Sequence, residues 1–586
     1  MPTHSSSGPP VPFYPLQQYA LLADGERAAA VGPRGDIVWM CAPRFDSGSI
    51  FSALIGGQGV YSVSPADPFV SGGCYGDASM IWTSRWTTGA GTTECRDALA
   101  YPGDAQISVL LRRVRAIDGP SSLNVTLHPR SDYDNEPMTD LHRHGDVWTA
   151  RCGALYLRWA GAGAARSHDA GQRLTLHLDL EQGGQHDLVL EISERPLPAE
   201  PVAADAAWRA TETTWRSAVP ALDGCLSRAD ARTSYAVLRG LTSSTGGMVA
   251  AATTSLPERA EAGRNYDYRY VWIRDQCFAG IAAAAVGDDP LLDAAVEFVT
   301  ARLLEHGDQL CPAYTTNGEP VPRQRHLNLS GYPGGFDIVG NHVTNQFQLD
   351  TFGEALQLFA IAAQRDRLDA EHWQAAQAAA SAISRRWQEP DAGIWELENR
   401  TWTHSRLTVV GGLRSIAANA PRDEAGRWIG LADHILADTS AQCLHADGRW
   451  RRAADDEAVD AALLFAGIRG CVPVDDPRTI TTLETYLQDL TVDGYAYRFR
   501  HDARPLADAE GSFLLCGFLV ALALQQCGQE LEARGWYERT RAACGPSLIF
   551  SEEFDVRQRY MRGNLPQAFV HALMLETSAR LATPTP

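Results

Sequence analysis

The chain has 586 residues, and no apolar run approaches the ~18 to 20 residues that span a bilayer, so we expect a soluble protein with no membrane partner. Its 71 acidic and 51 basic side chains give a formal charge of -20, which argues against nucleic acid as a partner and fits a neutral substrate such as a sugar. Every basic residue other than histidine is arginine, and the lack of lysine excludes Schiff-base and P-loop lysine chemistry.

The amino-terminal end, residues 1–14, is rich in serine and proline and predicts a disordered tail. It has neither the basic start nor the apolar segment of a secretory signal, so we expect a cytoplasmic protein. The 12 cysteines, scattered from Cys41 to Cys544, form no CxxC pair and no cluster with histidine at metal-ligand spacing. We therefore expect reduced cysteines, no metal and no cofactor. A homo-oligomer is compatible with this sequence.

Residues 15–200 show the two-residue period of half-buried β-strands. Leucine alternates with other residues throughout Leu174-Thr-Leu-His-Leu-Asp-Leu180, and Leu188-Val-Leu-Glu-Ile192 is a further strand. Gly, Asp and Pro turns separate these runs. The pattern predicts an all-β domain and favours a β-sandwich.

Pro196-Leu-Pro-Ala-Glu-Pro201 interrupts the strands, and we expect residues 201–225 to form a helical linker. Beyond this linker the hydrophobic period changes from two residues to 3.6. Residues 226–583 then hold about twelve helical stretches. Two of them begin with Asp288-Asp-Pro290 and Asp475-Asp-Pro477, which combine an Asp N-cap with a proline in the first turn. The stretches run over residues 228–242, 270–286, 290–306, 349–359, 370–388, 404–419, 424–442, 456–469, 476–490, 511–527, 530–544 and 565–582.

Twelve helices in six hairpins predict an (α/α)6 barrel with a cleft built from loops at one end. A helical solenoid is the alternative, but its fixed-period sequence repeat is absent. The sequence therefore predicts a multidomain β + α protein in which an N-terminal β-sandwich precedes an (α/α)6 barrel.

Two acidic clusters in the helical half suggest a pair of catalytic carboxyls. Ile394 and Trp395 precede Glu396, and an apolar setting would raise the pKa of this carboxyl until it holds a proton near neutrality, as a general acid must. Glu552 follows the apolar run Leu548-Ile-Phe550 and could present an ionised carboxylate as a general base. Such a pair across a cleft is what glycosidic bond cleavage needs, although a chain this acidic offers many glutamate pairs by chance.

The stretch Arg264-Asn-Tyr-Asp-Tyr-Arg-Tyr-Val-Trp-Ile-Arg-Asp275 mixes four aromatic residues with Arg and Asp. Aromatic faces stack on sugar rings, so Tyr268 and Trp272 are candidate substrate-binding residues. Trp395, beside Glu396, is a third. Arg274 and Asp275 could satisfy ring hydroxyls with charge-assisted hydrogen bonds. The alternative for this last pair is a buried Arg/Asp contact that pins the start of a helix.

Two further loops carry candidate sugar contacts. Arg498 lies between aromatic residues in Asp493-Gly-Tyr-Ala-Tyr-Arg-Phe-Arg500, where it could bind substrate or simply stack on the surface. Asn564 and Gln567 open the last helix in Gly563-Asn-Leu-Pro-Gln567, where both could bind hydroxyls. For Asn564 we favour a helix-capping role.

In their order and spacing, these motifs resemble those of bacterial members of glycoside hydrolase family 15, the glucoamylases, glucodextranases and trehalases, over almost the whole chain. At the amino end the resemblance rests on Gln18-Tyr-Ala-Leu-Leu22, Gly35-Asp-Ile-Val-Trp39 and Pro43-Arg-Phe-Asp-Ser47. In the helical half it rests on Asp267-Tyr-Arg-Tyr-Val-Trp-Ile-Arg-Asp275, Gln348-Leu-Asp350 with Gly353-Glu354, Gly393-Ile-Trp-Glu396, Glu510-Gly-Ser-Phe513, and Glu552-Glu-Phe-Asp555 with Gly563-Asn-Leu-Pro-Gln-Ala-Phe569.

The resemblance implies the same two-part architecture, with the (α/α)6 barrel of residues 226–583 as the catalytic domain. It also implies an inverting, exo-acting α-glucoside hydrolase that releases β-glucose from trehalose or short α-glucans. By motif position it implies Glu396 as general acid and Glu552 as general base. It implies Arg274 and Asp275 as ligands of the glucose at the non-reducing end, and Arg498 as a further sugar contact.

Some positions differ from the family's pattern. Glu398 and Glu553 lie one or two residues away from the candidate acid and base, and we expect them in supporting or surface positions. Gln276-Cys277 and His342 stand where small residues are common, and a changed pocket wall can discriminate between similar glucosides. These changes motivate an alternative function, an acid-initiated non-hydrolytic enzyme that transfers glucose or cyclises a substrate in a biosynthetic pathway. A non-catalytic sugar-binding protein is disfavoured because both carboxyls and the Arg-Asp pair are present.

Overall fold

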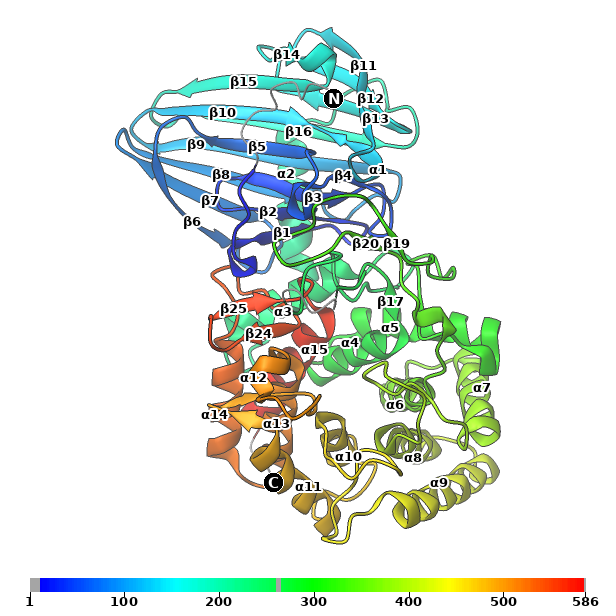
Figure 1. Cartoon of the computed structure of the whole chain (residues 1–586). Helices are drawn as coiled ribbons and strands as arrows, with labels where there is room; N and C mark the ends of the chain where they lie inside the picture. The colour runs from blue at the N-terminus through cyan, green and yellow to red at the C-terminus, as the bar shows by residue number, and fades with distance from the viewer. Residues whose placement is uncertain (1–10, 260–264, 584–586) are drawn as a thin grey trace.

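The structure is a computed structural model that describes residues 11–259 and 265–583. An antiparallel β-sandwich stands on a helical barrel, and the helix α2 (Ala204–Ala218) leads from one to the other (Figure 1). The fold class predicted from the sequence is confirmed. The predicted tail lies outside the described residues except for residues 11–14, and so does Arg264, the first residue of the aromatic stretch.

The sandwich consists of two antiparallel sheets, each with eight strands among the described residues. One sheet contains β1 (Ala20–Ala23), β2 (Ala28–Val31), β3 (Asp36–Cys41), β4 (Ser49–Phe51), β5 (Val60–Pro65), β10 (Ser121–His128), β14 (Arg166–His168) and β15 (Arg173–Leu180). The other contains β6 (Phe69–Tyr75), β7 (Trp82–Thr88), β8 (Thr92–Leu99), β9 (Ile107–Asp118), β11 (Glu136–His144), β12 (Val147–Cys152), β13 (Leu155–Ala160) and β16 (Gln185–Ser193). Leu174, Leu176 and Leu178 of β15 face the core between the sheets, as their period of two predicts.

The barrel contains an inner ring of helices that closes on itself, because each packs against the next and the last packs against the first. The ring is formed by α4 (Ile273–Ala285), α6 (Asp350–Gln364), α8 (Thr403–Ala417), α10 (Phe465–Ile468), α13 (Leu514–Gln526) and α15 (Ala568–Ala582). The helices that alternate with them along the chain are α3 (Arg228–Leu241), α5 (Asp289–His306), α7 (Ala370–Arg386), α9 (Arg422–Cys443), α11 (Pro477–Asp489) and α14 (Glu530–Arg541).

The inner and outer helices differ in how much of their surface is buried. The inner helix α13 is buried along nearly its whole length. The outer helix α9 buries one stripe, with Trp428, Ala432, Ile435, Thr439 and Cys443 at helical spacing, and its other residues are half-buried or exposed. The short elements are α1 (Ser131–Asp134), α12 (Leu506–Ala509), β17 (Val271–Trp272), β18 (Ala313–Tyr314), β19 (Arg325–His326), β20 (Ile338–Val339), β21 (Thr491–Val492), β22 (Tyr495–Ala496), β23 (Ser512–Phe513), β24 (Glu553–Asp555) and β25 (Tyr560–Arg562).

One predicted helix is much shorter than expected. The stretch 456–469 forms a loop, a 3-10 turn at Ala461–Leu464 and then only the four residues of α10. Asp460 holds the preceding loop by pairing with Arg452 at 3.4 Å, and Gly470, at a φ of +67°, ends the segment in the left-handed region. The two predicted Asp caps are confirmed: Asp288 accepts from the Leu291 N–H, and Asp476 accepts from the Arg478 N–H.

The sandwich also anchors the segment that leads into α4. Arg269 is fully buried and pairs with Asp267 through two hydrogen bonds. Its guanidinium donates to the Ser47 carbonyl at 2.9 Å and to the Tyr133 hydroxyl at 2.8 Å, both in the sandwich. The segment is therefore held on one side by the sandwich and on the other by the barrel.

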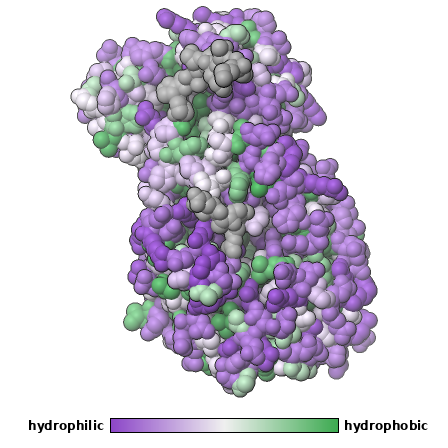
Figure 2. Space-filling view, in the orientation of Figure 1, coloured by the Kyte–Doolittle hydropathy of each residue, from purple (hydrophilic) through white to green (hydrophobic). Residues whose placement is uncertain are grey.

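Polar residues dominate the face of the molecule shown in Figure 2, where apolar residues form small, separate patches. Among the residues that the structure describes, no helix combines the length and the apolar character needed to cross a membrane.

Candidate active site

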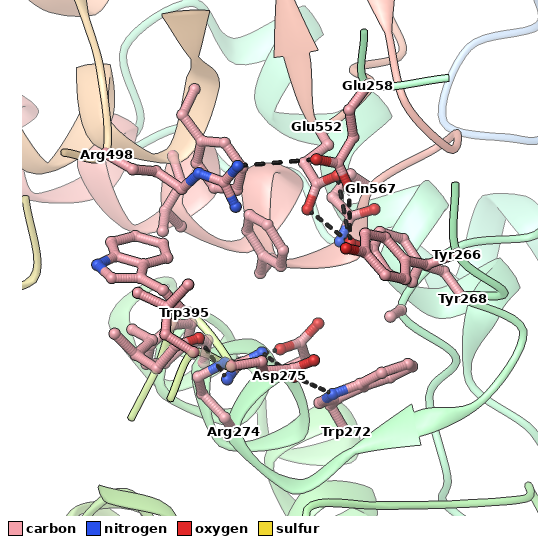
Figure 3. Close-up of a pocket in the computed structure, with 18 of the residues that line it drawn as sticks. Glu258, Tyr266, Tyr268, Trp272, Arg274, Asp275, Trp395, Arg498, Glu552 and Gln567 are labelled. Atoms are coloured by element: carbon pink, nitrogen blue, oxygen red, sulfur yellow. Dashed lines mark hydrogen bonds and ion pairs between the residues drawn. The ribbon is translucent and has the colours of Figure 1, made fainter. Parts of the chain in front are cut away.

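A cavity of about 320 Å³ lies where the inner helices begin. Its polar lining comes from segments that connect an outer helix to the following inner helix and from the first turn of α4. Residues far apart in sequence therefore surround one space (Figure 3). The predicted site residues that line it are Tyr268, Trp272, Arg274, Asp275, Trp395, Glu396, Arg498, Glu552 and Gln567.

Glu396 sits in a tight turn between α7 and α8. One oxygen of the buried Asp391 carboxyl accepts from the backbone N–H groups of Leu349 and Gly393 and from the Ser405 hydroxyl at 2.8 Å. Gly393 has a φ of +65°, and a Cβ there would lie 2.8 Å from the Trp402 ring. Glu396 itself has a φ of +55°, a conformation that non-glycine residues rarely adopt. The turn thus fixes the direction of the Glu396 side chain.

The surroundings of the Glu396 carboxyl differ from the apolar setting expected from Ile394 and Trp395. Its Oε1 accepts a 2.6 Å hydrogen bond from the Trp272 indole N–H and lies 3.6 Å from Arg274 Nη2. Arg274 also donates to the Ile394 carbonyl at 3.0 Å. The difference arises because α4 and the strand before it bring a donor and a cation across the barrel, which local sequence does not reveal.

Glu552 lies on the opposite wall. Figure 3 shows it beside Glu258, across the cavity from Arg274 and Trp272. The Tyr268 hydroxyl donates to Glu552 Oε1 at 3.0 Å and lies 3.5 Å from Glu258 Oε1. Two carboxyls with different hydrogen-bond partners therefore line one cavity.

The surroundings of Glu552 favour its protonated form, whereas the sequence analysis expected an ionised carboxylate. Burial raises the pKa of Glu552 well above its usual range, and the neighbouring Glu258 and Asp275 raise it further. The Arg498 guanidinium and the hydrogen bond from Tyr268 act in the opposite direction and lower it. Sequence inspection missed Glu258 altogether, since it lies in a loop with no distinctive motif.

Arg498 lies among carboxylates and aromatic rings. It donates to Glu510 at 2.8 Å and to Glu553 at 3.3 Å, and its guanidinium stands 4.4 Å from the centre of the Phe513 ring. Burial raises the pKa of Glu510, but Arg498 and His501 outweigh it and bring the value down to about 2. Arg498 thus lines the cavity from a fixed position.

Glu553 and Glu398 occupy different places from the two candidate catalytic carboxyls. Glu553 is fully buried and accepts from Arg498 and from the Gly511 N–H at 2.9 Å. Glu398 is exposed and pairs with Arg400 at 3.5 Å. Neither is among the residues that line the cavity.

Arg274 and Asp275 form the first turn of α4, with 3.3 Å between Nε and Oδ1. Asp275 is 1% exposed. Burial raises its pKa to about 6 against the opposing effect of Arg274. The pair lines the cavity and also stands at the start of the helix.

The two polar residues before α15 behave differently from each other. Asn564 is outside the cavity lining and does not cap the helix, whose N-cap is Gln567. Its side chain instead accepts from the Thr253 hydroxyl at 3.0 Å and donates to the Tyr266 carbonyl at 2.8 Å, because the chain folds back on the segment before α4. The capping role predicted for Asn564 is therefore wrong, and its contact with a sugar hydroxyl stays a prediction. Gln567 lines the cavity, and its Oε1 has no hydrogen-bond partner among the described residues.

The positions that depart from the family's pattern have different locations. His342 lines the cavity, as do Tyr266 and His501, which the sequence analysis did not single out. Gln276 instead has a structural role, since its amide bonds the Gly246 carbonyl and the Met248 N–H. Cys277 is fully buried beside it. Over the part of the chain that is described, no group of three or more His, Cys, Asp or Glu side chains could hold a metal ion.

Comparison with known proteins places the chain among enzymes. The model of glycosyl hydrolases family 15 matches residues 234–579, which contain both candidate carboxyls. The chain belongs to glycosyl hydrolase family 15. A model of the trehalase-like N-terminal domain matches residues 12–155 of this glycoside hydrolase.

Two relatives agree with this family assignment, and one solved structure agrees with the fold. The trehalase of Mycobacterium tuberculosis is 30% identical over 98% of this chain and 91% of its own. Trehalase 1 of Sulfolobus acidocaldarius is 27% identical over 96% of this chain and 98% of its own. A bacterial glucoamylase in complex with acarbose aligns with a TM-score of 0.73 at 13% identity, covering 99% of this chain and 97% of that one, and supports the shared fold.

Proposed function

We propose that this family 15 hydrolase removes glucose from the end of small α-glucosides with inversion at the anomeric carbon, and that trehalose is its first substrate. The observation that carries the proposal is that Glu396 and Glu552 line one cavity with different partners. Glu396 accepts from Trp272, and Glu552 accepts from Tyr268 on the wall opposite Trp272 (Figure 3). The trehalase names of the two relatives support trehalose as the substrate. The cavity volume of about 320 Å³ favours a small ligand held by its end over the middle of a polymer.

In this mechanism Glu396 donates its proton to the glycosidic oxygen as the bond to the anomeric carbon breaks. A water on the other face attacks that carbon and gives its proton to Glu552. The products carry the water oxygen on one sugar and the protonated oxygen on the other, and both carboxyls must then exchange protons with water. Tyr268 and Arg498 favour the ionised form of Glu552 that the water attack requires.

Binding of the terminal glucose involves the remaining groups. Arg274 and Asp275 reach its hydroxyls with charge-assisted hydrogen bonds, and Gln567 lines the cavity on the side of Glu552. Trp272 and Trp395 provide aromatic surface beside them. Arg498 completes the polar lining.

A panel of glucosides tests the proposal. Glucose release is measured with trehalose, maltose, isomaltose, panose and dextran, and we expect the highest kcat/KM on trehalose and the lowest on dextran. The Glu396→Gln protein, purified in the same way, controls for contaminating host enzymes. Glucose release from maltose or isomaltose but not from trehalose would reject the substrate while keeping the reaction class. No release from any of the five would reject both.

A further inference from the structure

The side chains of the segment before α4 alternate between two sides, as they do in a strand. Tyr266 and Tyr268 line the catalytic cavity, and their rings stack with 6.2 Å between the ring centres. Asp267 and Arg269 are buried on the other side, where Arg269 reaches the sandwich. The direction of the Tyr268 side chain therefore depends on how firmly its two neighbours are held.

The sandwich meets this segment through a strained turn, the short element α1 (Figure 1). Asp132, Tyr133 and Asp134 have φ values of +46°, +55° and +77°. Non-glycine residues rarely adopt such a left-handed backbone, and bulky ones keep it only where the surrounding structure imposes it. The Asp134 carboxylate holds the turn by accepting from the backbone N–H groups of Gln58 and Gly59 at 2.8 and 3.0 Å. Strain of this kind is concentrated where the direction of a side chain matters.

The Tyr133 hydroxyl connects the strained turn to the barrel. It accepts from Arg269 Nη2 at 2.8 Å and donates to the Ser47 carbonyl at 3.3 Å. Asp267 accepts from Nε and Nη2 of the same guanidinium, at 2.8 and 2.7 Å. Three other sandwich groups accept from Nη1, namely the carbonyls of Phe45 and Ser47 and the sulfur of Cys41. Tyr133 is thus the sandwich partner of Nη2.

We propose that Tyr133 is a positioning residue for the catalytic base, and that it acts through Arg269 on the direction of the Tyr268 hydroxyl. This inference rests on the role of Glu552 in the proposed function. Without the Tyr133 hydroxyl, one buried N–H of Arg269 loses its acceptor, so the guanidinium shifts to find another and the segment moves with it. The 3.0 Å hydrogen bond from Tyr268 to Glu552 then weakens.

A weaker hydrogen bond from Tyr268 has a definite effect on Glu552. This bond and the charge of Arg498 lower the pKa of Glu552, whereas burial and the nearby carboxyls raise it. The nearby carboxyls are those of Glu258, Asp275 and Glu553. Loss of part of the hydrogen bond therefore raises the pKa of Glu552. Because the base must be ionised, the acidic limb of the kcat/KM profile moves to higher pH.

The pH dependence of kcat/KM for Tyr133→Phe, which removes only the hydroxyl, tests the proposal. The substrate is the glucoside that wild type hydrolyses fastest. We expect the acidic limb to move up by roughly 0.5 to 1 pH unit, the shift given by partial loss of a charge-assisted hydrogen bond, with KM unchanged. A wild-type limb in a folded Tyr133→Phe would overturn this inference alone. Failure of wild type to hydrolyse any glucoside would reject the proposed function, and the inference with it.

Two comparisons separate positioning from general stability. Tyr61→Phe is the matched control, because its hydroxyl is buried in the sandwich core and accepts from Trp159 at 3.0 Å, without contacting Arg269. It should lower the melting temperature but keep the wild-type limb. In Tyr133→Phe/Tyr268→Phe the limb should lie where Tyr268→Phe alone places it, because both changes act on one hydrogen bond. Additive shifts would contradict an action through Tyr268.

A second variant tests the same turn with the Tyr133 hydroxyl intact, in case Tyr133→Phe does not fold. A Cβ at Gly48 would lie 3.1 Å from the Asp132 Cα, so Gly48→Ala presses on the turn. Its acidic limb should also move to higher pH. A wild-type limb in a folded Gly48→Ala would overturn the proposal.

Discussion

The indole N–H of Trp272 donates a 2.6 Å hydrogen bond to the Glu396 carboxylate, joining two segments that are 124 residues apart in sequence. Arg274, two residues beyond Trp272, approaches the same carboxylate oxygen at 3.6 Å. The segment before α4 also positions Tyr268, which donates to Glu552 on the other wall. One short segment therefore contacts both candidate catalytic carboxyls, and the sandwich holds that segment through Arg269.

Replacing Glu396 tests its role as proton donor. Glu396→Gln keeps an acceptor for Trp272 but has no proton to transfer, so kcat/KM on trehalose should fall by roughly 10² to 10⁴-fold. An aryl α-glucoside with an activated nitrophenyl leaving group needs no proton and should be largely spared. Parallel assays of the two substrates give the answer. The same loss on both would remove Glu396 from the acid role.

Replacing Glu552 should affect both substrates equally, because water must attack whichever group leaves. Glu552→Gln is therefore expected to be nearly inactive on trehalose and on the aryl glucoside. Glu553→Gln is the matched control, since Glu553 is the buried neighbour of Glu552 and pairs with Arg498 but does not itself line the cavity. An inactive Glu553→Gln beside an active Glu552→Gln would show that the base is the second glutamate.

Replacing Arg274 or Asp275 distinguishes a substrate-binding role of this pair from a role in fixing the start of α4. If the pair binds substrate, Arg274→Ala and Asp275→Ala remain folded and lose kcat/KM by a large factor. If it mainly pins α4, breaking this buried pair costs about 3 to 5 kcal/mol and lowers the melting temperature strongly. Circular dichroism with thermal melting measures this. Arg367→Ala, which breaks an exposed pair with Asp293, is the control and should leave the melting temperature nearly unchanged.

Much of the fold could be predicted from sequence because it follows local periods. The alternating leucines of β15 and the stripe of α9 are visible in the chain itself. The candidate acid and base were found through motifs. Glu258 was not, because it acts on Glu552 through space from a loop that has no pattern of its own. The helix-capping role predicted for Asn564 was wrong for a related reason. Its partners Thr253 and Tyr266 lie more than 290 residues away in the sequence.

The raised pKa of Glu552 predicts a pH effect of Glu258. The base must be ionised, so kcat/KM rises as pH increases through the pKa of Glu552 and is lost as pH falls below it. Glu258→Gln removes a negative charge that raises this pKa, so the acidic limb of the pH profile should move to lower pH. Asp502→Asn, an exposed carboxylate, should leave the limb in place. A shift to higher pH in Glu258→Gln would contradict the assignment of Glu552 as the base.

The anomers released from trehalose test the central claim most directly. Acid and base carboxyls that leave room for a water stand roughly 6.5 to 9.5 Å apart and invert the attacked carbon. The attacked glucose is then released as the β-anomer, while the departing glucose keeps its own α configuration. Proton NMR within the first turnovers, before mutarotation, should show α- and β-glucose rising in equal amounts. Release of α-glucose alone would mean retention through a covalent intermediate, and the roles of Glu396 and Glu552 as an inverting pair would be wrong.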